Sequence, residues 1–95
     1  MEAKKIIITG GATRIGRAIA LELADFDTQI VIHYSKSSKA ARNLKIELEN
    51  LGSVVYLLKA DLNNINQTQK IIDIANKKMK GINCLINNAS VFEND

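Results

Sequence analysis

The chain has 95 residues, a length that accommodates one domain at most. Its composition, 46% hydrophobic and 24% charged, is typical of a soluble globular protein. The net charge of +3 is a mild excess carried by dispersed lysines, so a nucleic-acid-binding protein is disfavoured.

Single cysteine and histidine residues limit the chemistry further. Cys84 has no partner for a disulfide within the chain, and His33 alone cannot form a histidine metal cluster, so no metal site is expected. Cys84 lies in an apolar run between Ile82 and Ile86, where we expect a buried, inert thiol. The first residues lead into only three isoleucines, too few for a signal peptide or a membrane span. We expect a cytoplasmic protein that does not bind membranes.

The first half of the chain predicts strand, helix, strand and helix. Ile6 to Ile8 form an apolar run followed by turn residues, which indicates a strand buried on both faces. A helix from Arg14 to about Phe26 follows, and the residues expected on its buried stripe are Ile15, Ile19 and Leu23. Gln29 to His33 is the second predicted strand. The next helix is expected to begin at a Ser37 cap, to end at Gly52, and to bury Leu44, Leu48 and Leu51.

The second half repeats the alternation. Val54 to Leu58 is the third predicted strand. A third helix is expected to be capped by Asn63 or Asn64, to be ended by Gly81, and to bury Ile71, Ile72, Ala75 and Met79. Ile82 to Ile86 is the fourth predicted strand.

A β-α-β-α-β-α-β order predicts an α/β protein with helices on both faces of a parallel sheet. Right-handed crossovers favour the strand order 3-2-1-4. A ligand crevice is then expected beyond the carboxyl ends of the first and fourth strands, where the order reverses. Residues 1–95 are therefore predicted to form a three-layer, Rossmann-type partial domain, the N-terminal nucleotide-binding part of a larger fold.

The turn after the first strand, Thr9 to Gly16, carries the strongest functional signal. Gly10 allows dihedral angles closed to other residues, and Gly16 allows the helix to pack close to the sheet. The first amides of the helix form an anion site, aided by the helix dipole. The expected cofactor-binding residues here are Gly10, Thr13, Arg14, Ile15 and Gly16. The alternative is an ordinary loop that happens to contain glycines.

The end of the second strand indicates which dinucleotide binds. NAD-binding proteins place a carboxylate there, whereas this chain has no acid over His33, Tyr34, Ser35, Lys36 and Ser37. Hydroxyl, ammonium and imidazole groups suit a 2′-phosphate, and Arg14 can add a guanidinium, so the expected cofactor is NADP(H). We expect His33 to contact the cofactor rather than lie in the core. The alternative for the loop from Ser35 to Lys39 is a solvated helix cap.

Two further segments follow the third and fourth strands. After the third strand, Ala60, Asp61 and Leu62 can offer a carboxylate and an amide to an adenine ring. The alternative is that Asp61 only marks the entry to the following helix. After the fourth come Asn87 and then Asn88, Ala89 and Ser90, which can bridge loop backbones and admit a ribose or nicotinamide, or form a plain turn. Both segments lie at the expected crevice.

These motifs, in this order and spacing, resemble those of the short-chain dehydrogenase/reductase family over the whole chain. Arg14 stands where the common family turn has glycine, and together with His33, Tyr34 and Ser90 it resembles the pteridine reductase branch. That resemblance implies hydride transfer to a pterin or a related C=N or C=O group. It also implies substrate contacts by Arg14 and Ser90 and stacking by Phe92, for which a core or loop position is the alternative.

The family's catalytic Tyr-x-x-x-Lys pair does not occur in these 95 residues, because neither Tyr34 nor Tyr56 is followed by lysine at the required position. The alternative function is therefore a non-catalytic nucleotide-binding fragment or truncated gene product. An apolar edge on the fourth strand would favour association or a homo-oligomer. An extended-type epimerase or a methyltransferase fits less well, because Thr13 interrupts the epimerase turn and no acid follows the second strand.

Overall fold

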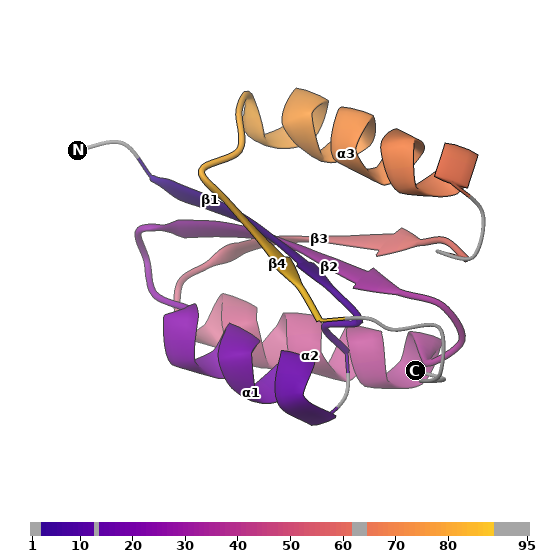
Figure 1. Cartoon of the computed structure of the whole chain (residues 1–95). Coiled ribbons are helices and arrows are strands. Elements are labelled where there is room, and N and C mark those ends of the chain that lie inside the picture. The colour runs from indigo at the N-terminus through magenta and orange to yellow at the C-terminus, as the bar shows by residue number, and fades with distance from the viewer. Residues whose placement is uncertain (1–2, 13, 62–64, 89–95) are drawn as a thin grey trace.

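A computed structural model describes residues 3–12, 14–61 and 65–88, with side chains except that of residue 65. Seven elements follow one another along the chain (Figure 1). They are β1 (Lys4–Thr9), α1 (Arg14–Leu23), β2 (Thr28–Tyr34), α2 (Ser38–Asn50), β3 (Val54–Lys59), α3 (Ile65–Met79) and β4 (Cys84–Asn87). The predicted order of elements is confirmed.

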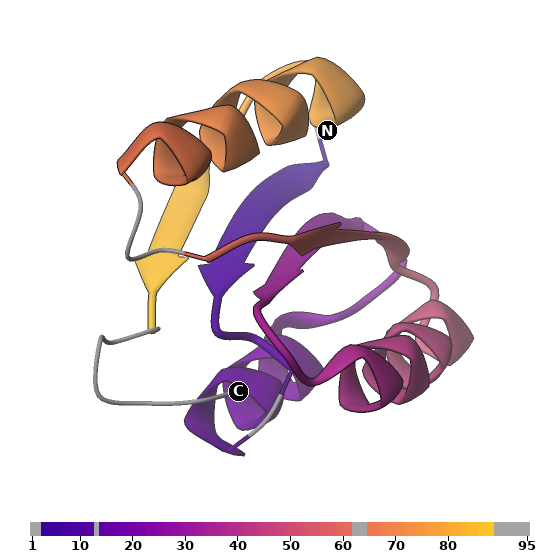
Figure 2. The same ribbon diagram turned by 90° about the vertical axis from the view of Figure 1, so that its right-hand side faces the viewer.

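The four strands form one parallel sheet in the order β3-β2-β1-β4. Ile7 at the centre of β1 aligns with Val31 of β2 on one side and with Leu85 of β4 on the other. Helices α1 and α2 cover one face of the sheet and α3 covers the other, as Figure 2 shows. The predicted strand order and the three layers are therefore confirmed.

Alternate residues of β1 and β2 enter two separate cores, as the two-residue period of a strand requires. The core under α1 and α2 contains Ile6, Ile8, Ile30, Ile32, Ala20, Leu44 and Leu48. The core under α3 contains Ile7, Val31, Ile71, Ala75 and Met79. Because β1 and β2 are covered on both faces, their runs of β-branched residues are continuous rather than alternating.

Three predicted core positions are wrong. Ile15 is 66% exposed, because α1 turns Gly16 and Ala20 toward the sheet and its buried stripe starts one residue later than expected. Leu51 is 49% exposed because it lies beyond the last turn of α2. Cys84 is exposed rather than buried, since β4 is paired only with β1 among the described strands.

The helix ends also differ from expectation in detail. Helix α1 stops at Leu23, and Phe26 lies in the following turn with 88% of its surface exposed. Gly52 ends α2 as predicted, with φ of 97°, and the amides of Gly52 and Ser53 donate to the carbonyls of Glu49 and Leu48. This pair of bonds is a Schellman motif. Ser37 stands at the cap position of α2, but its hydroxyl makes no capping hydrogen bond.

Helices α1 and α2 are joined by an ion pair. Both guanidinium nitrogens at the end of Arg17 donate to the Glu47 carboxylate, at 2.6 and 2.9 Å. The hydrogen bond from Arg17 holds the pKa of Glu47 below its usual value. Both side chains are partly exposed, so the pair orients the helices more than it stabilises them. No described helix is long and apolar enough to cross a membrane.

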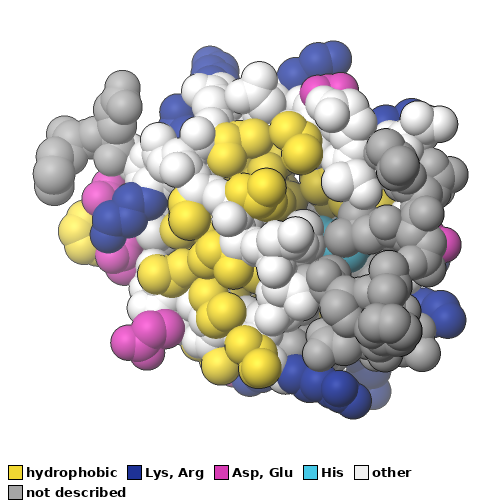
Figure 3. Space-filling view, in the orientation of Figure 1, with side chains coloured by type: hydrophobic (Ala, Val, Ile, Leu, Met, Phe, Trp, Pro, Cys, Tyr) yellow, Lys and Arg dark blue, Asp and Glu magenta, His cyan; other side chains and the backbone are white. Residues whose placement is uncertain are grey.

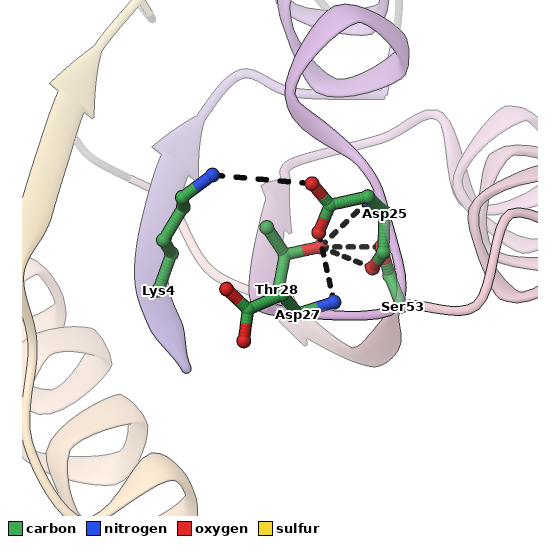
Figure 4. A network of polar contacts seen from close by, with 5 residues as sticks. All are labelled: Lys4, Asp25, Asp27, Thr28 and Ser53. Atoms are coloured by element: carbon green, nitrogen blue, oxygen red, sulfur yellow. Dashed lines mark hydrogen bonds and ion pairs between the residues drawn. The ribbon is translucent and has the colours of Figure 1, made fainter. Parts of the chain in front are cut away.

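A buried hydroxyl network closes the end of the sheet at which β2 begins (Figure 4). The hydroxyl oxygens of Thr28 and Ser53 lie 2.6 Å apart, and both lie within 2.9 Å of the Asp25 carbonyl oxygen. The Asp25 amide donates back to the Thr28 hydroxyl at 3.0 Å. The two hydroxyl hydrogens of Thr28 and Ser53 are thus shared among three pairs of oxygen atoms. The Thr28 oxygen also accepts the hydrogen of the Asp25 amide.

Thr28→Val should destabilise the chain by about 1–3 kcal/mol, because the Asp25 amide and the Ser53 hydroxyl lose a partner while the side-chain shape is kept. Thr28→Ser is the matched control, since it keeps the hydroxyl and removes one methyl group, at a cost of about 1 kcal/mol. Urea unfolding of the two variants measures both effects. Destabilisation by serine but not by valine would show that the methyl group, not the network, matters.

Candidate functional site

All four strands end at one edge of the sheet, because they are parallel (Figures 1 and 2). The segments that follow them there are the turn at Gly10, the loop at Ser35, the segment at Ala60 and the residue Asn88. The order of the sheet reverses between β1 and β4. In open parallel sheets, ligands bind at this edge and at this point of reversal.

The turn after β1 has the geometry expected of a phosphate-binding loop. Gly10 adopts a φ of 60°, which is the left-handed conformation predicted for it. A Cβ atom on Gly16 would lie 2.3 Å from the Gly10 carbonyl oxygen and 2.8 Å from the side-chain nitrogen of Asn88. The start of α1 is therefore pressed against the turn, and the close approach involves the turn and Asn88 rather than the sheet surface.

Gly16→Ala should move the turn after β1, because the added methyl group meets a backbone oxygen that cannot rotate away. We expect a loss of about 1–3 kcal/mol of unfolding free energy and weaker nucleotide binding. Ala18→Ser adds one atom to the exposed side of the same helix and should change the unfolding free energy by only about 0.5 kcal/mol. Urea unfolding compares the two; equal stability would contradict the close approach.

Arg14 begins α1 with a φ of 55°, a conformation that costs a non-glycine residue about 1 kcal/mol. Only glycine adopts this conformation without that cost. The side chain of Arg14 is exposed at the mouth of the turn. The exposed guanidinium group of Arg14 therefore stands beside the turn on a strained backbone position.

His33 differs most from its predicted role. Its side chain is only 1% exposed, and both ring nitrogens lie within hydrogen-bond distance of the backbone, at Gly10 and at Ala60. The ring therefore lies in the core and cannot face a cofactor, contrary to the expectation. The sequence could not reveal this, since only the tertiary fold brings Gly10 and Ala60 to either side of the ring.

Asn88 bridges loop backbones, as its residue type suggested. Its side-chain amide donates to the Gly10 carbonyl at 3.1 Å, and its backbone amide donates to the Thr9 hydroxyl at 3.0 Å. The Thr9 hydroxyl in turn lies 3.1 Å from the side-chain oxygen of Asn87. The ends of β1 and β4 are thereby locked together beside the turn. Thr9 is a structural contributor that the sequence analysis did not single out.

An open hollow of about 640 Å³ lies beside the ends of β2 and β3. Its lining is polar and consists of Ser35, Lys36, Lys59, Ala60, Asp61 and Gln67. Lys59 and Gln67 were not predicted, although a cation ending a strand next to Ala60 is visible in the sequence. The Gln67 side-chain oxygen accepts the Asp61 amide hydrogen at 2.9 Å and so holds that segment against α3.

The remaining residues named from the sequence differ in their positions. Tyr34 is partly buried and packs against the core under α1 and α2, so its ring serves packing. Tyr56 packs on the α3 side, 5.3 Å beneath the Lys78 ammonium group. Ile15 is exposed near the start of α1. Thr13, Leu62, Ala89, Ser90 and Phe92, like the cap candidates Asn63 and Asn64, lie outside the described residues.

Hydrophobic side chains gather over β4 and beside it in Figure 3. Leu85 of β4 is 51% exposed, and a small hollow of about 80 Å³ separates β1 and β4 from α3. The residues that line this hollow are Ile7, Thr9, Thr68, Ile71, Ile72, Leu85 and Asn87. Association through the β4 edge stays a prediction.

Comparison with known proteins identifies the class. Residues 4–95 match the family model of the short chain dehydrogenases. A short chain dehydrogenase of Burkholderia cenocepacia, whose crystal structure is a complex with NADP, superimposes with a TM-score of 0.90 at 30% identity, over 97% of this chain and 38% of that one. A short-chain dehydrogenase of Oenococcus oeni superimposes with a TM-score of 0.83, also at 30% identity, over 97% of this chain and 43% of that one.

Curated protein sequences that are similar to this chain belong to the same class. A short chain dehydrogenase/reductase of Aspergillus aculeatus is 34% identical over 90% of this chain and 32% of its own length. An L-rhamnose-1-dehydrogenase of Scheffersomyces stipitis is 32% identical over 96% of this chain and 36% of its own length. The chain belongs to the short-chain dehydrogenase/reductase family, and it spans about a third of the length of these curated relatives.

Proposed function

We propose that this chain is the NADP(H)-binding part of an oxidoreductase of the short-chain dehydrogenase/reductase family. The observation that carries the proposal is the hollow beside β2 and β3, where Ser35, Lys36 and Lys59 lie and no acid ends β2. Two ammonium groups and a hydroxyl suit a 2′-phosphate, whereas a carboxylate at the end of β2 would suit an unmodified ribose.

The residues present fit a dinucleotide at three places. The turn at Gly10 and the first amides of α1 form an anion site for the pyrophosphate, with Arg14 at its mouth. The exposed carboxylate of Asp61 borders the same hollow as Lys36 and can accept from an adenine amino group. Gly16 leaves no room for a side chain, which keeps the turn in this shape.

The start of α2 adds a second anion site on the 2′-phosphate side. The first intrahelical bond of α2 runs from the Ala41 amide to the Ser37 carbonyl, so the amides of Lys39 and Ala40 precede the helical ladder. The Ser37 hydroxyl does not cap the helix. In our proposal, Ser37 and these amides bind the 2′-phosphate together with Ser35 and Lys36.

Arg14→Ala and Arg14→Gly should both lower the ratio of NADP⁺ to NAD⁺ affinity by about tenfold, since both remove the guanidinium group that we assign to the 2′-phosphate, which NAD⁺ lacks. Only glycine relieves the positive φ, so Arg14→Gly should be about 1 kcal/mol more stable than Arg14→Ala. Calorimetric titration and urea unfolding measure the two effects separately. Arg42→Ala removes an exposed cation one turn into α2 and serves as the control for net charge.

Equal binding of NAD⁺ and NADP⁺ by the unaltered chain would contradict the assignment of the hollow to a 2′-phosphate. An unchanged ratio of NADP⁺ to NAD⁺ affinity in both Arg14 variants would show that Arg14 does not bind the 2′-phosphate. Ser35, Lys36 and Lys59 would then remain as its proposed ligands. A fall of the same size in Arg42→Ala would show that net charge alone steers the phosphate.

We further propose a pterin or a related ring with a C=N or C=O group as the substrate of the whole protein. The nicotinamide group supplies a hydride to such a ring. Support comes from three residues: Arg14 replaces the glycine common in the turn, Ser90 follows the Asn-Asn-Ala segment, and Phe92 stands two residues further on. Arg14 would donate to the pterin, and Phe92 would stack on the opposite face from the nicotinamide.

Phe92→Ala should weaken dihydrobiopterin binding to the NADP⁺-saturated chain by about fivefold, because one stacking contact contributes about 1 kcal/mol. NADP⁺ affinity should stay nearly constant. Phe26→Ala is the matched control, because Phe26 is exposed in the turn before β2, at the other end of the sheet. Fluorescence quenching by the pterin measures both variants. Equal loss in the two variants, or loss of NADP⁺ binding in Phe92→Ala, would contradict the stacking role.

A further inference from the structure

The imidazole of His33 occupies the point at which three segments of the candidate site meet. Its Nδ1 atom accepts the Gly10 amide hydrogen at 2.9 Å, and its Nε2 atom lies 2.8 Å from the Ala60 carbonyl oxygen. A carbonyl oxygen only accepts, so Nε2 carries the hydrogen and Nδ1 does not. The surroundings thus select one neutral tautomer of a ring that is 1% exposed.

The backbone around His33 holds the same two segments. The His33 carbonyl accepts the Gly11 amide at 3.0 Å, and the Tyr34 carbonyl accepts the Ala60 amide at 3.1 Å. The turn at Gly10 and the segment at Ala60 are therefore each joined to the end of β2 by one backbone hydrogen bond and one hydrogen bond to the imidazole ring. Without the ring, the buried Gly10 amide and the Ala60 carbonyl would each lose the partner that the ring supplies.

We propose that His33 is a positioning residue for the dinucleotide: its neutral imidazole sets the separation between the phosphate-binding turn at Gly10 and the adenine-side segment at Ala60. The inference rests on the proposed NADP(H) site. It assigns to His33 no contact with the cofactor.

The test uses His33→Gln and His33→Phe in the whole chain, with NAD⁺ and NADP⁺ as ligands. Phenylalanine fills the space without either bond, and we expect about tenfold weaker binding of both nucleotides with their affinity ratio unchanged. Glutamine carries one donor and one acceptor and should restore part of the affinity.

Calorimetric titration at neutral pH measures the affinities. If His33→Phe does not fold, as circular dichroism would show, a folded His33→Gln that binds both nucleotides less tightly than the unaltered chain, with their affinity ratio unchanged, still supports the inference. Loss of NADP⁺ affinity alone in His33→Gln would overturn it, because that result would indicate a direct contact with the 2′-phosphate.

Nitrogen NMR of the imidazole is independent of any ligand. A hydrogen on Nε2 at neutral pH is expected, and a hydrogen on Nδ1 would overturn the inference while leaving the proposed function intact. Failure of the unaltered chain to bind NADP⁺ at neutral pH would overturn the proposed function, and the inference with it. Normal binding by both His33 variants would overturn the inference alone.

Discussion

The close approach between the first turn of α1 and the loop after β1 is the constraint on which the site depends. Gly16 lies so near the Gly10 carbonyl that no side chain fits, and the amide of Asn88 reaches the same carbonyl from the end of β4. The turn after β1, the start of α1 and the end of β4, which lies 78 positions after Gly10, are thereby brought together. The amides of Gly10 and Gly11 are bonded to His33, so the amides that face no partner within the helix are those that begin α1.

A second constraint is the double coverage of β1 and β2. Both strands are buried by helices on each face and paired on each edge, so their side chains leave little freedom to the backbone. The carboxyl ends of these strands consequently hold the Gly10 turn and the Ser35 loop in fixed positions. The polar residues of the site lie just beyond this rigid centre, and the cations Lys36 and Lys59 lie at its edge.

Residue patterns predicted the elements well because burial on both faces leaves a clear signature. The isoleucines of β1 and β2, the Leu44 and Leu48 stripe of α2 and the terminal Gly52 all have the positions expected of them. The errors involve residues whose burial depends on a neighbour. Ile15 was misplaced by one position around α1, and Cys84 belongs to a strand paired on one side only among the described residues.

The sequence by itself determined the order of the elements, the parallel sheet, the glycine turn after β1 and the lack of an acid after β2. These follow from local periodicity, glycine placement and residue type. Only the tertiary structure decided what His33 does, that Lys59 and Gln67 border the hollow, and that Gly16 packs on Asn88 as well as on the turn. The physical reason is distance along the chain: His33 is bonded to residues 23 positions before it and 27 after it. A polar side chain at a strand end can serve the ligand or the backbone, and the decision depends on which backbone groups the fold brings to it.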